Sequence, residues 1–208
     1  ISAPVEVTST DAGSSSKKVY FRGATGIPGT VIDINDPAQD VFSLNGANYV
    51  RCENLKLKNG CNGLVVANGL AVDVVGCHSY SNSEQGIFMF MCSSGTVSRS
   101  KCYDNQSSGI MISYSAGVVT ISENECYGQQ GNGIVSADSA VAIVGNKSHN
   151  NGGAGVFVEV SSSTTIVITN NECLENNLDG INVSCLNLDM SGNIVGCNGS
   201  YGIVTACS

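Results

Sequence analysis

Charged side chains recur at one position of a repeat in this sequence. Lys101, Glu125, Lys147 and Glu172 stand 22 to 25 residues apart, and His78 precedes them by one step. On neighbouring strands about 4.8 Å apart, such side chains would form alternating ion pairs. These pairs either fix the register of the repeats, each with little effect on stability, or supply charge to a binding surface.

Aromatic rings recur two residues later in the same repeat, before Leu174 takes the position. Stacked rings beside cations could bind an acidic sugar, because ring faces pack against sugar C–H groups and Arg or Lys binds carboxylates. The alternative is that the rings only cover a half-exposed sheet. The candidate substrate-binding residues are Tyr80, Tyr103, Tyr127, His149, Arg99, Lys101 and Lys147.

The same surface contains the candidates for lyase chemistry. A lyase needs a base and a cation that neutralises the substrate carboxylate. Tyr103 and His149 are candidates for proton transfer, and Lys101 is the candidate cation. The sequence leaves open whether the protein is a polysaccharide lyase, a glycoside hydrolase or no enzyme.

A pair of acids is the minimum for glycoside hydrolysis, with the two carboxyl groups about 5 to 9.5 Å apart. Glu123 and Glu125 are expected to alternate along one strand and to share a face, about 7 Å apart. Arg99 and Lys101 would lie directly beneath and hold both acids ionised, whereas an acid catalyst needs a raised pKa. The pair is therefore a weak catalytic candidate.

Metal and disulfide chemistry receive less support. The ten cysteines include no C-x-x-C and the chain has only two histidines, so we expect no metal site and no cofactor. Cys102 aligns with Cys126, and Cys185 with Cys207, as buried small apolar residues would. Stacking on adjacent coils also permits a disulfide, while many unpaired thiols suit assembly in a cytoplasm, as for a virion protein.

Short strands with a fixed period must position these residues. A glycine and an aliphatic residue recur at Gly63-Leu64, Gly86-Ile87, Gly109-Ile110, Gly133-Ile134, Gly155-Val156, Gly180-Ile181 and Gly202-Ile203, and Asp40-Val41 lies 23 residues upstream of the first pair. Polar residues recur with the same period at two further positions of the repeat, which we call the two polar columns. The first is expected to contain Asn54, Cys77, Ser100, Asn124, Asn146, Asn171 and Asn193, and the second Asn59, Asn82, Asn105, Gln129, Asn151, Asn176 and Asn198. Stacked asparagines at turns form side-chain ladders.

This G-I-x-V and N-x-x-x-x-N pattern resembles the right-handed parallel β-helix of the pectate-lyase-like superfamily, which includes the bodies of phage tailspikes. The resemblance covers residues 1–208 and implies an all-β solenoid of about eight coils, each of 22–25 residues. Residues 1–39 are expected to form irregular first coils and residues 40–208 regular coils. We expect a single domain that is a fragment of a longer chain.

An apolar stripe is expected on the outside of the glycine-led strands. Because side chains alternate along a strand, the outward positions carry Val65, Phe88, Met111, Val135 and Phe157, with Phe90 in the next outward column. Missing parts of the chain, a threefold interface or a sugar-ring platform would each explain the stripe. In the resembling enzymes this sheet carries charged catalytic groups, but here it offers one carboxylate, Glu159.

The composition argues against some classes of binding partner. The net charge of −8 argues against nucleic acid and anionic membranes. The leading hypothesis is a domain of tailspike or extracellular type that binds a polysaccharide, and the sequence leaves open whether it also degrades the polymer. The alternative is a non-enzymatic spike or adhesin module that forms a trimeric shaft. Both place the protein in a virion tail or outside the cell.

Overall fold

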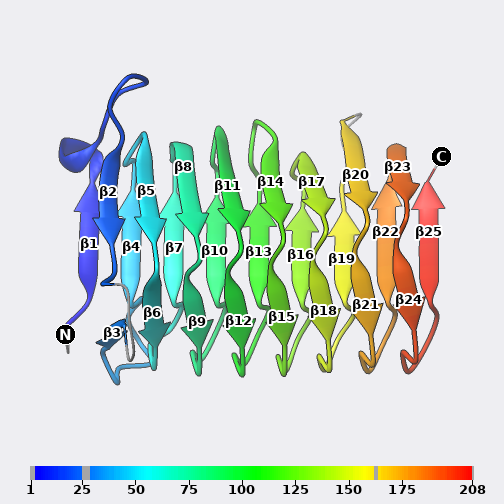
Figure 1. The fold of residues 1–208 in the computed structure, drawn as a ribbon. Helices are drawn as coiled ribbons and strands as arrows, with labels where there is room; N and C mark the ends of the chain where they lie inside the picture. The colour runs from blue at the N-terminus through cyan, green and yellow to red at the C-terminus, as the bar shows by residue number, and fades with distance from the viewer. Residues whose placement is uncertain (1–2, 25–28, 162–163, 208) are drawn as a thin grey trace.

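The computed structural model describes residues 3–24, 29–161 and 164–207, which form three parallel sheets (Figure 1). Sheet 1 contains β1 (Val5–Thr8), β4 (Phe42–Asn45), β7 (Leu64–Ala67), β10 (Ile87–Phe90), β13 (Ile110–Ser113), β16 (Ile134–Ala137), β19 (Val156–Glu159), β22 (Ile181–Cys185) and β25 (Ile203–Cys207). Sheet 2 contains β2 (Val19–Arg22), β5 (Val50–Glu53), β8 (Leu70–Val75), β11 (Ser94–Ser98), β14 (Val119–Ser122), β17 (Val141–Val144), β20 (Thr165–Thr169) and β23 (Asn187–Ser191). Sheet 3 contains β3 (Thr30–Asp33), β6 (Leu55–Lys58), β9 (His78–Tyr80), β12 (Lys101–Tyr103), β15 (Glu125–Tyr127), β18 (Lys147–His149), β21 (Glu172–Leu174) and β24 (Ile194–Gly196). A 3-10 turn, η1, spans Ser9–Asp11.

Each coil contributes one strand to every sheet, and each strand pairs in parallel with the strands one coil before and after it. Eight complete coils stack side by side, and β25 follows the last of them (Figure 1). This confirms the predicted all-β solenoid of about eight coils. The first strands, β1 to β3, join the same three sheets as the later coils. Residues 1–2 and 25–28 of the segment predicted to be irregular lie outside the described residues.

The core lies between the three sheets and is built from alternate residues of each strand. In sheet 1 the position after the glycine is fully buried from Leu64 to Ile181, and the position two residues further is buried from Val66 to Val183. Ile203, on the last strand, is 48% exposed. The cysteines at positions 102, 126 and 173 are also interior, as predicted, and all ten cysteines are free thiols. Their burial explains why small apolar side chains serve at these positions. Cys207 is in register with the buried Cys185, as predicted, but it is exposed on the last strand.

From Gly76 onward, two residues make each corner from sheet 2 to sheet 3. At the corner from sheet 2 to sheet 3, the first residue has a positive φ and points outward, and the second is buried and polar in the later coils. Asn124, Asn146 and Asn171 are such second residues, and each donates a side-chain hydrogen bond of about 3.0 Å to the asparagine of the next coil. Their side-chain oxygens also accept hydrogen bonds from the corner backbone N–H groups of Ser100, Asn124 and Asn146.

The alignment of coils that we expected from the sequence was wrong by one residue in the early coils. Asn54 lies in register with Gly76 and Arg99, not with Cys77, and Asn59 lies with Ser81. Likewise Phe42, not Val41, is in register with Leu64. The additional residues lie in the turns between sheet 3 and sheet 1, because a turn accommodates an insertion that a paired strand does not.

The outer face of sheet 1 carries the predicted apolar column. Val65, Phe88, Met111, Val135 and Phe157 are in continuous register along the solenoid. Most are half-buried, but Val135 is only 7% exposed. Its larger neighbours on β13 and β19 flank it and restrict access to it. The ring centroids of Phe90 and Phe88 are 6.0 Å apart, and Phe90 extends the apolar surface toward the next corner.

Candidate functional site

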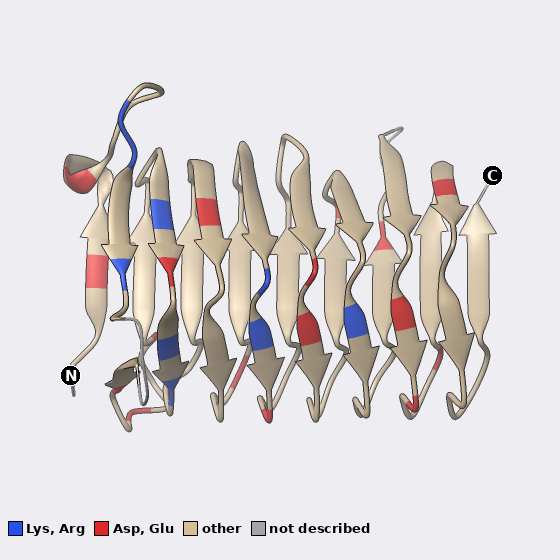
Figure 2. Ribbon diagram, in the orientation of Figure 1, with Lys and Arg blue, Asp and Glu red and all other residues tan. Residues whose placement is uncertain are grey.

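The outer face of sheet 3 brings together most of the residues that the sequence singles out. Its first outward column runs from Lys56 through His78 and Lys101 to Glu125, and then to Lys147 and Glu172. Figure 2 shows the resulting alternation of basic and acidic strands from β12 to β21. The second outward column contains Lys58 and the four predicted rings.

The rings form one continuous stack. Ring centroids of Tyr80 and Tyr103 are 4.7 Å apart, those of Tyr103 and Tyr127 are 5.2 Å apart, and those of Tyr127 and His149 are 5.3 Å apart. The angle between the planes of neighbouring rings is only 5° to 6°. Lys58 covers the face of the Tyr80 ring that points away from Tyr103, and its Nζ lies 5.8 Å from the centroid of that ring.

The stacking restricts the expected packing of sugars on these ring faces. Most faces already contact a neighbouring ring, or Lys58 at one end, because the coil spacing matches the thickness of a stacked ring pair. The ring edges, which carry the phenol hydroxyls and the imidazole nitrogens, remain at the surface. They can offer hydrogen bonds to a ligand but no apolar platform.

Glu125 joins the two columns. Its Oε2 lies 2.5 Å from Lys101 Nζ, and its Oε1 lies 3.5 Å from His149 Nε2. The hydrogen bond from Lys101 is the main reason that the pKa of Glu125 is lowered, and the same bond raises the pKa of Lys101. Both groups are therefore charged at neutral pH.

The side-chain amide of Asn150 contacts the imidazole of His149. Its amide Nδ2 lies 3.0 Å from His149 Nδ1. If this amide donates, His149 carries its proton on Nε2, the nitrogen that faces Glu125. The result is a chain of polar contacts from Asn150 through His149 to Glu125.

Glu123 does not share a strand with Glu125, which corrects the expected carboxylate pair. It occupies the corner between β14 and β15 with φ of 57°, and Arg99 occupies the same corner one coil earlier with φ of 50°. Both side chains are exposed, and neither forms an ion pair within the described part of the chain. The left-handed backbone turns the side chain out of the alternation that a continuous strand would impose.

A hollow of about 350 Å³ opens at this corner. Gly145 follows Glu123 in the corner column, and a Cβ added to it would meet no atom within 4 Å. The missing side chain leaves the depression, and Lys101, Lys147 and Glu125 form the wall toward sheet 3. The full lining is Arg99, Ser100, Lys101, Glu123, Asn124, Glu125, Gly145 and Lys147.

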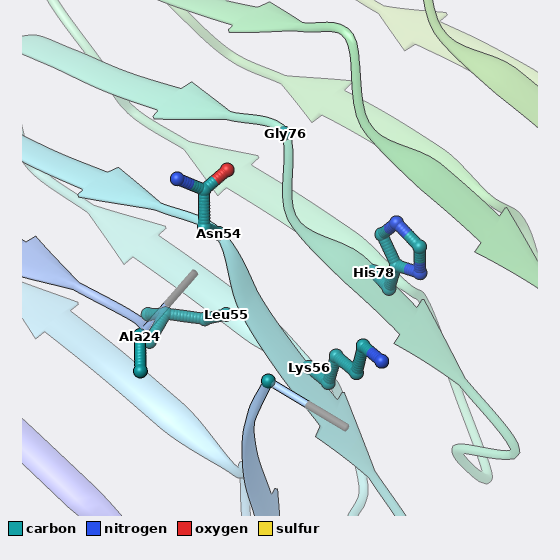
Figure 3. A pocket seen from close by; sticks show the side chains of 7 residues that line it. Ala24, Asn54, Leu55, Lys56, Gly76 and His78 are labelled. Carbon is teal, nitrogen blue, oxygen red and sulfur yellow. The ribbon is translucent and has the colours of Figure 1, made fainter. Parts of the chain in front are cut away.

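A second hollow, of about 270 Å³, lies at Gly76, three coils before Gly145 (Figure 3). It is lined by Ala24, Gly29, Asn54, Leu55, Lys56, Gly76 and His78. Sequence reasoning missed Lys56 as a site residue. The alternation in Leu55-Lys56-Leu57-Lys58, with buried leucines and outward lysines, is the signal that could have found it.

The chemistry that this surface offers is charge and hydrogen bonding. Burial raises the pKa of Tyr103 to about 12, and the neighbouring tyrosines add to the shift. Tyr103 therefore stays protonated at neutral pH, and Lys101 is held as a cation, so neither serves as a base there. No group of three or more His, Cys, Asp or Glu residues in the described chain is arranged to hold a metal ion. None of the helices that the structure describes is long and apolar enough to cross a membrane.

Comparison with known proteins identifies the family. The family model for the right-handed β-helix region matches residues 19–171 and, in a second overlapping match, residues 114–208. The chain belongs to the right-handed β-helix family. No curated protein matches it in sequence.

Solved β-helix structures share the fold at low sequence identity. The periplasmic alginate epimerase AlgG superposes with a TM-score of 0.69 at 16% identity, over 81% of this chain and 47% of the epimerase. The A-module of a mannuronan C-5 epimerase from Azotobacter vinelandii gives 0.69 at 18% identity, over 80% and 49%. A pectate lyase gives 0.59 at 12% identity, over 99% and 67%. This β-helix thus shares its fold with proteins that act on polysaccharides, and spans about half the length of the epimerases.

Proposed function

We propose that the protein binds an acidic polysaccharide along the outer face of sheet 3 and the corner that leads into it. The distribution of cations is the observation that carries the proposal. The chain has nine Lys and Arg against seventeen Asp and Glu. Five of these nine lie on this surface, namely Lys56, Lys58, Arg99, Lys101 and Lys147. An acidic protein that concentrates its cations beside two hollows presents a local attraction for anions.

Arg99 and Lys147 are the cations that the larger hollow presents to a ligand. Lys58 pairs with Asp33 and Lys101 pairs with Glu125. Lys147 lies 3.9 Å from Glu172 and its side chain is 60% exposed, and Arg99 is exposed at the corner. Both line the larger hollow, where they would meet carboxylates, while the phenol edges beside them would bond to sugar hydroxyls.

The similar structures support the choice of an acidic ligand. Their names specify alginate and pectate, which are polymers of uronic acids, as the material on which they act. A protein that binds such a polymer would work outside the cytoplasm. Binding is the proposed activity, and Glu125 and His149 are the candidates if cleavage accompanies it.

Affinity electrophoresis in gels that contain pectate, alginate or neutral dextran tests the proposal. Arg99→Gly combined with Lys147→Gln should weaken binding of the acidic polymers about tenfold, and dextran should retard no variant. Gly76 and Gly145 occupy the same corner column, so glycine suits the backbone at position 99. Lys17→Gln removes an exposed cation remote from sheet 3 and should change nothing. Equal retardation of the wild type in pectate, dextran and polymer-free gels would refute the proposal.

A structural role is the second candidate, supported by the apolar column on sheet 1. In this alternative the protein is a tailspike or adhesin module, and Phe88, Met111 and Phe157 form the interface of a trimeric shaft. Sedimentation should then find a trimer that Met111→Lys dissociates. A wild type that sediments as a monomer at high concentration would exclude this role for the chain.

A further inference from the structure

The smaller hollow combines three features that point to an anionic ligand. Lys56 and His78 stand in register on β6 and β9, and both side chains project on the same side of sheet 3 (Figure 3). Gly76 forms the adjoining corner, where a Cβ would approach Asn54 Oδ1 to 2.9 Å. Glycine at this position therefore keeps the hollow open between the two corner residues.

Basic residues predominate in the part of the column beside the hollow. Lys56, His78 and Lys101 are three consecutive members of one column, and the first acid of that column, Glu125, lies beyond Lys101 and pairs with it. The charged groups that act on His78 are Lys56 from β6 and Lys101 from β12. Burial, followed by these two lysines, lowers the pKa of His78. Within the described residues His78 forms no ion pair with an acid.

We infer that this hollow is a subsite for one carboxylate of the bound polysaccharide, and that His78 takes up a proton from solvent when the carboxylate binds. The inference rests on the proposed function, because it assigns one position on the same surface. A carboxylate beside Lys56 would offset the repulsion from the two lysines, which adds to burial in disfavouring the charged form of His78. The imidazolium would then supply a second charged hydrogen-bond donor to the ligand.

The pH dependence of binding has a definite sign. An anion favours the charged imidazole, so the pKa of His78 is higher in the complex than in the free protein. Affinity rises as the pH falls from the bound-state pKa to the free-state pKa and is level outside this interval. A separation of one unit between the two values corresponds to about a tenfold change in affinity.

An NMR pH titration of the histidine rings tests the subsite directly. The chain has two histidines, so two sets of imidazole signals are expected, and His149→Gln assigns them. Saturating D-galacturonate, the monosaccharide acid, should raise the pKa of His78 by at least about half a unit. Glucose, which lacks the carboxylate, should leave it unchanged. Inorganic sulfate distinguishes a carboxylate subsite from a general oxyanion site.

Lys56→Gln is the decisive variant. It should raise the pKa of His78 in the free protein, because one repulsive charge is gone, and should abolish the further rise with galacturonate. Lys17→Gln is the matched control and should behave as the wild type. Circular dichroism of both variants checks that the coils still form.

The outcomes separate the subsite from the proposed function. An unchanged His78 pKa in galacturonate overturns the subsite, and retained retardation by pectate would leave the wider proposal standing. A rise in galacturonate without any pectate binding supports the subsite and refutes the wider proposal. A response to sulfate alone overturns the assignment to a carboxylate.

Discussion

Glu125 limits how much positive charge sheet 3 offers to a ligand. Its carboxylate contacts Lys101 at 2.5 Å and lies 3.5 Å from the His149 ring. A polyuronate must compete with this internal anion for Lys101. This ion pair, the shortest among those of the described residues of sheet 3, thus opposes the binding that we propose for the surface.

Glu125→Gln should therefore tighten binding to pectate several-fold, whereas Lys101→Gln should weaken it. Isothermal titration calorimetry on the two variants measures both changes. Weaker binding by Glu125→Gln would show instead that the carboxylate itself contacts the ligand. Dextran, which carries no charge, is the ligand control.

Stability should respond to the same pair only weakly. The pKa of Glu125 is lowered in the folded protein. The pair therefore stabilises the fold above the carboxyl group's unfolded pKa of about 4.3, and this contribution is lost as the pH falls through the lower, folded value. A partly exposed pair contributes about 1 kcal/mol at most.

The strands of this fold could be predicted from the sequence more accurately than the geometry of the candidate site. Outward and inward faces follow from a period of two, so the columns of Lys101, Tyr103 and Val65 were assigned correctly. Corners have no such period. Glu123 was assigned to a strand because alternation was extended through a left-handed corner, and Asn54 was misaligned because asparagine is common at both corner positions. The ring stack was expected, but which ring surfaces remain free depends on spacing and side-chain rotation in three dimensions.

Asn176 and its neighbour Asn177 allow a matched test of the buried corner amides. Asn176 is 1% exposed, accepts hydrogen bonds from the backbone and side chain of Asn151, and donates to Ser148 O and Asn198. Asn176→Ala leaves several of these groups buried without partners, which should cost about 2 to 5 kcal/mol. Asn177 is exposed, so Asn177→Ala should change stability by less than about 0.5 kcal/mol. Urea unfolding followed by circular dichroism compares the two, and equal losses would contradict a special role for the buried amide.

The whole molecule carries a charge of −8, opposite to the local charge proposed for binding. An acidic polymer is repelled at long range and attracted only near sheet 3. Added salt screens both effects, because the Debye length falls from about 10 Å at 0.1 M to about 3 Å at 1 M. We expect faster association but weaker equilibrium binding at higher salt.

Biolayer interferometry on immobilised pectate, with NaCl varied over this range, tests that expectation. The dissociation rate should rise more than the association rate. An equilibrium affinity that is unchanged or increases with salt would contradict charge-based binding. Lys17→Gln should show the same salt dependence as the wild type.

Register between coils has a consequence for evolution and engineering. Ile110 pairs directly with Ile134, so residues 110–133 are one complete structural module, and their removal would join Gly109 to Ile134 without shifting any column. Such a deletion should leave a protein that still unfolds cooperatively, whereas removal of residues 110–121 should not. It would also place Lys101 next to Lys147 and Tyr103 next to His149. Related proteins can thus change the number of coils, and the order of charged residues along sheet 3, by gaining or losing whole modules.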